Sequence, residues 1–150
     1  MKSRTPALRL RVPDETVSFS DGHYGLCRQH LAAECGDIIV RRADGVFAYQ
    51  LAVVVDDAAM GVTQVVRGRD LLLSTPRQLY LFRLLGAPPP SYFHLPLLLT
   101  SDGRRLSKRD RDLDLDALRT RGYGAEDIVG RLAYTAGLLS QPQAMSLREV

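Results

Sequence analysis

The sequence lacks the features that would place it among secreted or membrane proteins. Its 150 residues contain no tryptophan and only two cysteines, Cys27 and Cys35, which are too few for the disulfide framework of a small secreted domain. The longest apolar stretches, such as 51–55 and 95–99, are far shorter than the ~20 residues of a membrane-spanning helix. The N-terminal residues contain no apolar segment typical of a signal peptide. We therefore expect a reduced, soluble, cytoplasmic protein with no membrane partner.

Motifs for several common chemistries are also missing. There is no glycine-rich phosphate-binding loop of the Walker or Rossmann type, and no serine lies in a recognisable nucleophile elbow. The two cysteines flank His30, but two thiols and one imidazole do not complete a zinc site, so we expect free thiols and no metal site. Asp56 and Asp57 are adjacent on an expected helix, where neighbouring side chains point about 100° apart. This geometry favours two solvated carboxylates over a metal-binding pair.

The composition that remains is that of a globular domain. Hydrophobic residues make up 45% of the chain and charged residues 25%, and a chain of this length can bury a core without disulfides or metals. The 20 Lys and Arg residues against 17 Asp and Glu residues give a net charge of +3. This mild excess permits an RNA or nucleotide partner without requiring one.

The hydrophobic pattern interleaves strands and helices up to about residue 100 and is helical afterwards. A pair of short strands is expected at 8–12 and 17–19, and a short helix is expected at 26–35. The later segments are expected to form strands at 37–42, 62–66 and 93–99 and helices at 46–60, 75–85, 113–121 and 125–139. The pattern predicts an α/β layer followed by a helical appendage.

The most informative stretch is the charged loop 102–110, which reads Asp-Gly-Arg-Arg-Leu-Ser-Lys-Arg-Asp. Cations on such a loop can close over a polyphosphate and offset the charge that develops during phosphoryl or adenylyl transfer. A solvated surface loop is the alternative, and charge density alone favours that alternative.

The order of motifs along the chain resembles that of class I aminoacyl-tRNA synthetases of the glutamyl type. The segment Leu106-Ser107-Lys108-Arg109 resembles the KMSKS signature of this family. Four segments upstream resemble the family in the same order: 41–57, 61–70, 74–78 and 94–97. A basic pentapeptide alone is a weak signal, but the combination is highly specific.

The resemblance extends from about residue 7 to residue 140. Leu71-Leu72 and the lack of a long extension after the loop favour the short members of the family, which glutamylate queuosine in a tRNA anticodon. The residues from 110 onward are more similar to ordinary glutamyl- or glutaminyl-type enzymes, and Arg69 is unusual for the family. The sequence leaves open whether the acceptor is the end of tRNA(Glu) or the queuosine of tRNA(Asp).

The resemblance implies an α/β fold that forms the second half of a Rossmann-like nucleotide-binding domain. Residues 1–100 would form a partial catalytic core, 101–112 the KMSKS-type loop, and 113–150 a helical region like the one that contacts the tRNA stem. The implied partners are ATP with Mg²⁺, L-glutamate and tRNA. The implied reaction is the ATP-dependent formation of glutamyl-adenylate, followed by transfer of the glutamyl group to tRNA.

The resemblance also assigns candidate site residues. Lys108 would be catalytic and would stabilise the pyrophosphate-bearing transition state, and Tyr49 and Arg67 would hold glutamate. The ATP-binding loop would consist of Arg105, Leu106, Ser107, Lys108 and Arg109. From the residues alone, Tyr49 is equally consistent with a core aromatic, and Arg67 with a structural partner of Asp70.

One signature of the family is absent. The first half of its nucleotide fold contains a His-x-Gly-His motif, and none of the three histidines, His23, His30 and His94, forms it. The chain thus resembles the C-terminal half of the catalytic core, so we expect it to be inactive alone and to self-associate through an uncovered apolar face. A catalytically dead nucleotide- or RNA-binding module, or a non-functional remnant, are the alternatives.

Overall fold

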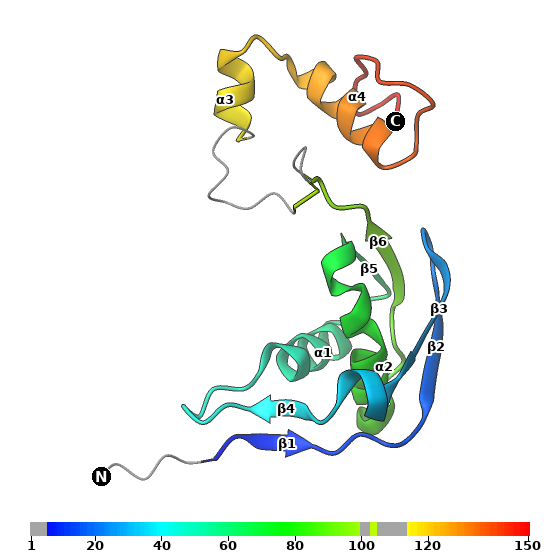
Figure 1. The fold of residues 1–150 in the computed structure, drawn as a ribbon, viewed down its shortest axis with the longest axis vertical. Coiled ribbons are helices and arrows are strands. Elements are labelled where there is room, and N and C mark those ends of the chain that lie inside the picture. Colours follow the sequence, from blue (N-terminus) through cyan, green and yellow to red (C-terminus); the bar gives the residue numbers. More distant parts are fainter. Residues whose placement is uncertain (1–5, 100–102, 105–113) are drawn as a thin grey trace. The chain divides into compact units, whose positions relative to one another are not determined.

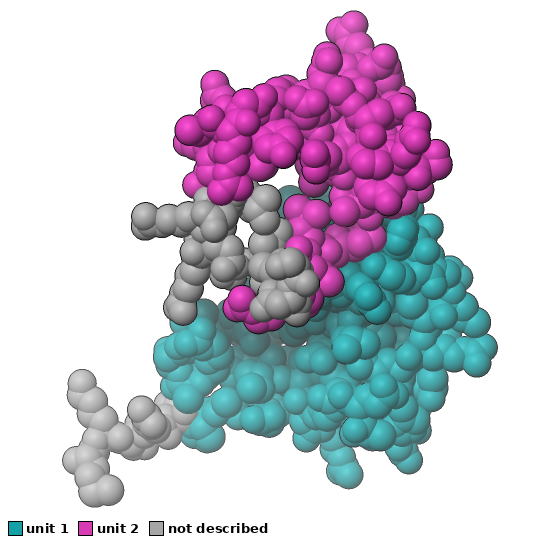
Figure 2. Space-filling view, turned by 45° about the horizontal axis from the view of Figure 1, so that its top comes forward, with its two compact units in different colours: residues 1–94 teal, residues 95–150 magenta. Residues whose placement is uncertain are grey.

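The computed structural model describes residues 6–99, 103–104 and 114–150. The chain divides into two compact units, residues 1–94 and residues 95–150, drawn in teal and magenta in Figure 2. Unit 1 contains the sheets and the two longest helices of the first hundred residues, and unit 2 contains the two C-terminal helices (Figure 1). Among the described segments, no helix is both long enough and apolar enough to cross a membrane.

The larger sheet of unit 1 has four strands in the order β3-β2-β6-β5. These strands are β2 (Thr16–Asp21), β3 (Gly25–His30), β5 (Gln64–Gly68) and β6 (Ser91–Leu95). Strands β2 and β3 form an antiparallel hairpin. Strand β2 is parallel to β6, with Asp21 opposite Tyr92, so the end of β2 lies beside residues that follow it by about seventy positions.

The smaller sheet pairs β1 (Leu8–Leu10) antiparallel with β4 (Ile38–Arg41). The strands expected at 8–12 and 17–19 are present as β1 and as part of β2, and they lie in different sheets. The expected helix at 26–35 is wrong over its first half, because residues 25–30 form β3 and only Leu31–Cys35 turn into a short π-helix, η1. The reason is the turn before β3: Gly25 adopts a φ of 68°, which reverses the chain and brings β3 back along β2.

The helices of unit 1 follow their sequence signals. Helix α1 (Tyr49–Met60) and helix α2 (Thr75–Leu85) each end at a glycine in the left-handed conformation, Gly61 and Gly86. A 3₁₀ helix, η2 (Arg69–Ser74), leads from β5 into α2. Helix α1 contacts α2 and β4, and α2 also contacts β2. The core lies between them and consists of Ile38, Val54, Leu81 and Phe82.

Unit 2 contains α3 (Leu115–Thr120) and α4 (Ala125–Thr135). The carboxylate of Asp114 accepts a hydrogen bond from the Ala117 N–H at 2.7 Å, which caps the first turn of α3. The C-terminal tail crosses α4 at Gly130, where a side chain would overlap the backbone of Gln143. The expected helices at 113–121 and 125–139 are thus present, with α3 and α4 ending a few residues earlier.

Candidate functional site

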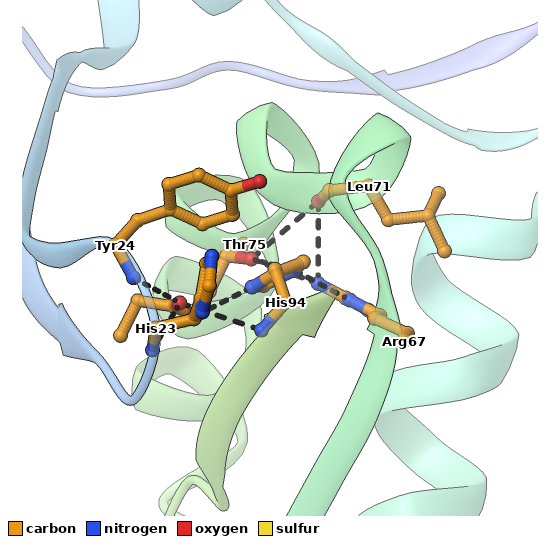
Figure 3. Close-up of polar contacts among 7 residues, drawn as sticks. His23, Tyr24, Arg67, Leu71, Thr75 and His94 are labelled. Atoms are coloured by element: carbon orange, nitrogen blue, oxygen red, sulfur yellow. Dashed lines mark hydrogen bonds and ion pairs between the residues drawn. The ribbon is translucent and has the colours of Figure 1, made fainter. Parts of the chain in front are cut away.

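A cluster of polar side chains lies where β2, β5 and β6 end and where α2 begins (Figure 3). Asp21 is the last residue of β2, Arg67 and His94 are the last but one of β5 and β6, and Thr75 is the first of α2. Asp21, Thr75 and His94 are buried, with at most 4% of each residue exposed. Buried polar groups persist in folded proteins when they have hydrogen-bond partners, and these residues bond to one another.

Asp21 is held by hydrogen bonds to both of its carboxylate oxygens. Its Oδ1 accepts bonds from the backbone N–H groups of His23 at 3.0 Å, Tyr24 at 2.9 Å and His94 at 3.3 Å. Its Oδ2 lies 2.6 Å from His94 Nδ1. Burial by itself raises the pKa of Asp21, but these hydrogen bonds outweigh it and lower the pKa below its ordinary value of 3.8. Asp21 is therefore an ionised carboxylate at neutral pH.

Arg67 reaches into the cluster from β5. Its Nε donates to His94 Nε2 at 3.0 Å, and its Nη2 donates to Thr75 Oγ1 at 2.8 Å and to the Leu71 carbonyl at 3.4 Å. The guanidinium carbon lies 5.0 Å from the centre of the Tyr92 ring, a cation–π distance. Among the described residues, hydrogen bonds engage Nε and Nη2, which leaves Nη1 as the nitrogen available to a ligand.

The charge of Arg67 persists although the side chain is half-buried. Burial is the main influence on the pKa of Arg67 and lowers it, while the neighbouring Tyr92, Tyr49, Asp57 and Asp70 act in the opposite direction. An arginine remains protonated at neutral pH even so. Burial also raises the pKa of Tyr92 to about 12, against the opposing effect of Arg67, so the ring faces the cation as a neutral phenol.

Tyr49, the second residue expected to hold glutamate, is the first residue of α1. It is 54% exposed, so it is not a core aromatic. It lies close enough to influence the pKa of both Arg67 and Tyr92. Tyr49 and Arg67 therefore belong to the same compact unit, and Tyr49 raises the pKa of Arg67.

A second polar chain joins the start of α1 to the start of α2. The buried Gln78 donates from Nε2 to Gln50 Oε1 at 2.8 Å, and Gln50 donates from Nε2 to Ser74 Oγ at 3.1 Å. Gln50 follows Tyr49 in the chain, and Ser74 precedes Thr75. These bonds thus fix the backbone on which Tyr49 stands relative to the backbone on which Thr75 stands.

The described residues do not include the predicted ATP-binding loop. Arg105, Leu106, Ser107, Lys108 and Arg109 lie outside the described residues. Cys27 and Cys35 are free thiols, and burial raises the pKa of the Cys27 thiol, with a smaller effect of Asp21 in the same direction. Across residues 6–99, 103–104 and 114–150, no three His, Cys, Asp or Glu side chains gather in a group that could hold a metal ion.

Sequence reasoning missed most of the cluster around Arg67. The motif order included His94 within the segment 94–97, but no site role was expected for His94, Tyr92 or Asp21. The spacing of these residues along the chain gives no local signal, because their proximity depends on the parallel pairing of β2 with β6. The alternative partner for Arg67, Asp70, raises its pKa, but the hydrogen bonds given above run to His94, Thr75 and Leu71.

Comparison with known proteins identifies the family of the chain. Residues 1–138 match the family described as tRNA synthetases class I (E and Q), catalytic domain. The chain is 58% identical over 139 residues to a glutamyl-Q tRNA(Asp) synthetase of Nitratidesulfovibrio vulgaris, covering 92% of this chain and 43% of that protein. It is 52% identical over 147 residues to the protein of that name from Symbiobacterium thermophilum, covering 98% of this chain and 45% of the relative.

A solved structure also resembles the fold. A glutamate tRNA ligase from Elizabethkingia meningosepticum, crystallised with its amino acid, superimposes with a TM-score of 0.70 at 27% identity, over 85% of this chain and 29% of that one. The expected α/β fold is thereby confirmed. The chain spans less than half the length of these curated relatives. The match over residues 1–138 shows that the chain belongs to the class I tRNA synthetases of the E and Q group, within their catalytic domain.

Proposed function

We propose that this chain is the glutamate-holding part of a synthetase that activates glutamate with ATP and transfers it to tRNA. The observation that supports the proposal most strongly is the guanidinium group of Arg67. Hydrogen bonds to His94 and Thr75 hold it in one orientation, and within the part of the chain that the structure describes they leave Nη1 to a ligand. A planar guanidinium binds a carboxylate through directed, charge-assisted hydrogen bonds. The names of the relatives, which are glutamyl-Q tRNA(Asp) synthetases and a glutamate tRNA ligase, support the same substrate.

The chemistry requires one carboxylate of glutamate to be held and the other to react. In this proposal, Arg67 and the exposed Tyr49 bind one carboxylate, which leaves the other free to attack the α-phosphorus of ATP. The new oxygen–phosphorus bond forms as the bond to pyrophosphate breaks, and the products are glutamyl-adenylate and pyrophosphate. ATP enters as its magnesium complex, so the metal comes with the substrate.

The charged loop would act on the phosphates. Lys108 is proposed to stabilise the negative charge that grows on the leaving pyrophosphate, and Arg105 and Ser107 to shape the loop around it. A Lys108→Ala change in an active form of the protein would then lower the rate of adenylate formation more than it weakens ATP binding. If the rate of adenylate formation fell no more than the affinity for ATP, Lys108 would have no special role in the transition state.

The acceptor in this proposal is the queuosine of tRNA(Asp), and the identity of 50–59% to glutamyl-Q tRNA(Asp) synthetases favours it. The end of tRNA(Glu) is the competing acceptor. Transfer of radiolabelled glutamate to queuosine-containing tRNA(Asp), to tRNA(Asp) without queuosine and to tRNA(Glu) distinguishes them. Labelling of tRNA(Glu) alone would reassign the acceptor.

The experiment that tests the function is glutamate-dependent ATP–pyrophosphate exchange. It is run with the 150-residue chain and with the same chain joined to the part of the N. vulgaris relative that it does not match. We expect no exchange by the chain alone, because the charged loop without a second phosphate-binding element does not orient ATP for attack, and clear exchange by the completed protein. A completed protein that binds tRNA or ATP without exchange would favour the catalytically dead module.

Two further properties belong to the proposal. Several apolar side chains of unit 1 are more than half exposed, among them Val46, Phe47, Met60 and Val66. Such a surface is expected to be covered in the working protein, so the chain alone should self-associate, which sedimentation at increasing concentration measures.

The cytoplasm is the expected location, since tRNA is the proposed partner.

A further inference from the structure

We propose that Asp21 and His94 are positioning residues for the Arg67 guanidinium. Asp21 holds His94 in the tautomer with its proton on Nδ1, and His94 in this form sets the direction of the guanidinium group. The substrate on which this device acts rests on the proposed function. The device itself rests on the hydrogen bonds among buried side chains of unit 1. Figure 3 shows His94 beside Arg67 and Thr75, on three different elements of the fold.

The donor and acceptor roles follow from the chemistry of the partners. A guanidinium group only donates hydrogen bonds, and an ionised carboxylate only accepts them. His94 Nε2 therefore accepts the bond from Arg67 Nε at 3.0 Å, and the proton of the neutral ring lies on Nδ1, where it is donated to Asp21 Oδ2 at 2.6 Å. The opposite tautomer would place an N–H against the N–H of Arg67.

Asp21 specifies this tautomer because its two carboxylate oxygens cannot exchange places, so Oδ2 always faces His94. Three backbone N–H groups, those of His23, Tyr24 and His94, all point at Oδ1. The carboxylate is thereby fixed in its plane, with Oδ2 directed at the imidazole. The ring is 0% exposed, so water does not offer Nδ1 an alternative partner.

Arg67 is then held along one edge and over one face. Nε and Nη2 lie on the same edge of the guanidinium group, and they bond to His94 and to Thr75 Oγ1. The Tyr92 ring lies under the face at 5.0 Å. Tyr92 and His94 are two residues apart on β6, so their side chains point to the same side of the sheet. The edge with Nη1 keeps a fixed direction, and orientation of this kind determines how well a carboxylate is bound.

The test is the protonation of His94 in the intact 150-residue chain, measured by ¹⁵N NMR of the imidazole nitrogens. The chain has three histidines, and His23→Gln and His30→Gln, at positions that are not buried, identify the signals of His94 by elimination. At neutral pH we expect a protonated Nδ1 and an unprotonated Nε2. A proton on Nε2, or a ring protonated on both nitrogens, would overturn the proposal, and this measurement does not depend on any variant that fails to fold.

Asp21→Asn tests the link to Arg67. The three backbone donors will retain the amide oxygen at the position of Oδ1, so the amide NH₂ will face His94 Nδ1 and donate to it. The ring proton should then move to Nε2, where it opposes Arg67 Nε. Asp44→Asn is the matched control, because Asp44 also accepts a backbone N–H and contacts a basic side chain, but at the surface. An unchanged tautomer in Asp21→Asn would contradict the proposal.

Glutamate titration separates this device from the proposed function. The Arg67 Nε–H signal should shift when glutamate is added to the wild-type chain, and Asp21→Asn should weaken that binding roughly tenfold or more. If the tautomer is as expected but glutamate shifts nothing in the chain or in its completed form, the proposed function fails and the positioning of Arg67 stands. If glutamate binds equally well to Asp21→Asn and Asp44→Asn, the positioning role fails and the function stands.

Discussion

Two carboxylates of unit 1 lie at almost the same distance from a basic side chain, in opposite surroundings. Asp21 Oδ2 is 2.6 Å from His94 Nδ1, and both side chains are fully buried. Asp44 Oδ2 is 2.7 Å from Arg42 Nη2, with 48% and 62% of the two side chains exposed. An exposed pair gains little because water and salt compete for both charges. A buried pair has no such competitor, so its partners and their directions are specified.

The difference teaches that distance alone does not measure what a contact between a carboxylate and a basic side chain contributes. Asp44 accepts one backbone N–H besides its contact with Arg42, whereas Asp21 accepts three. The second nitrogen of His94, Nε2, also accepts a hydrogen bond from Arg67 Nε, so the buried pair is joined to Arg67. Removing either carboxylate is therefore expected to have effects of very different size and kind.

The largest expected effect is the loss of stability in Asp21→Ala. The change leaves the Nδ1–H of His94 and three backbone N–H groups without an acceptor in a buried site. Each buried donor left without an acceptor costs about 1–3 kcal/mol, so the total is enough to unfold much of a marginally stable domain. Urea unfolding followed by circular dichroism measures the loss. A cost no larger than that of Asp44→Ala would remove the distinction between the two carboxylates.

The same carboxylate should make stability depend on pH in acid. The pKa of Asp21 is lowered in the folded chain, so the unfolded chain binds its proton at a higher pH. Its contribution is fully present above the ordinary value of 3.8 and is lost as the pH falls through the lower folded value. Urea unfolding at a series of pH values between about 5 and 2 should show a shallower decline for Asp21→Asn than for the wild-type chain. Parallel curves would contradict the assignment.

The next effect is on substrate. In the completed protein, Arg67→Lys keeps the charge but removes the planar group that bonds to His94 and Thr75 along one edge. Losing a charge-assisted bond costs about 1.5–3 kcal/mol, so the glutamate concentration for half-maximal exchange should rise roughly 10- to 150-fold. An unchanged dependence on glutamate would remove Arg67 from the site.

A smaller effect is expected from Thr75→Val, which keeps the shape of the side chain and removes the acceptor for Arg67 Nη2. The net value of such a bond is about 1 kcal/mol, so glutamate use should weaken by roughly fivefold while Nε stays bonded to His94. Thr75→Ser, which keeps the hydroxyl, is the control in the same exchange assay. Equal effects of the two changes would point to a disturbance of the start of α2 instead.

The smallest effect is expected from Asp44→Ala. The exposed pair with Arg42 should contribute less than about 1 kcal/mol, and raising the salt to about 1 M should abolish even that, because the Debye length falls to ~3 Å. Urea unfolding of the wild-type chain and of Asp44→Ala at low and high salt measures the contribution of the pair and its dependence on salt. A contribution as large as that of Asp21 would mean that burial is not what separates the two pairs.

The sequence predicted local features better than distant ones. The ends of α1 and α2 were readable because Gly61 and Gly86 stop the helices within the chain itself, and Thr75-Pro76 starts α2. The pairing of β1 with β4 was not readable, because it joins residues about thirty positions apart, and an alternating pattern gives no partner. Arg67 and Tyr49 were predicted as site residues from the resemblance to a family. Asp21 and His94 become neighbours only through the folded sheet.

The central claim is that the chain belongs to an enzyme that selects an amino acid with a side-chain carboxylate. The measurement is ATP–pyrophosphate exchange by the completed protein with glutamate, glutamine or aspartate as substrate. The account predicts exchange with glutamate and far less with glutamine, since the neutral amide offers Arg67 no charge. Exchange that is equal for glutamate and glutamine, or absent with all three, would contradict it.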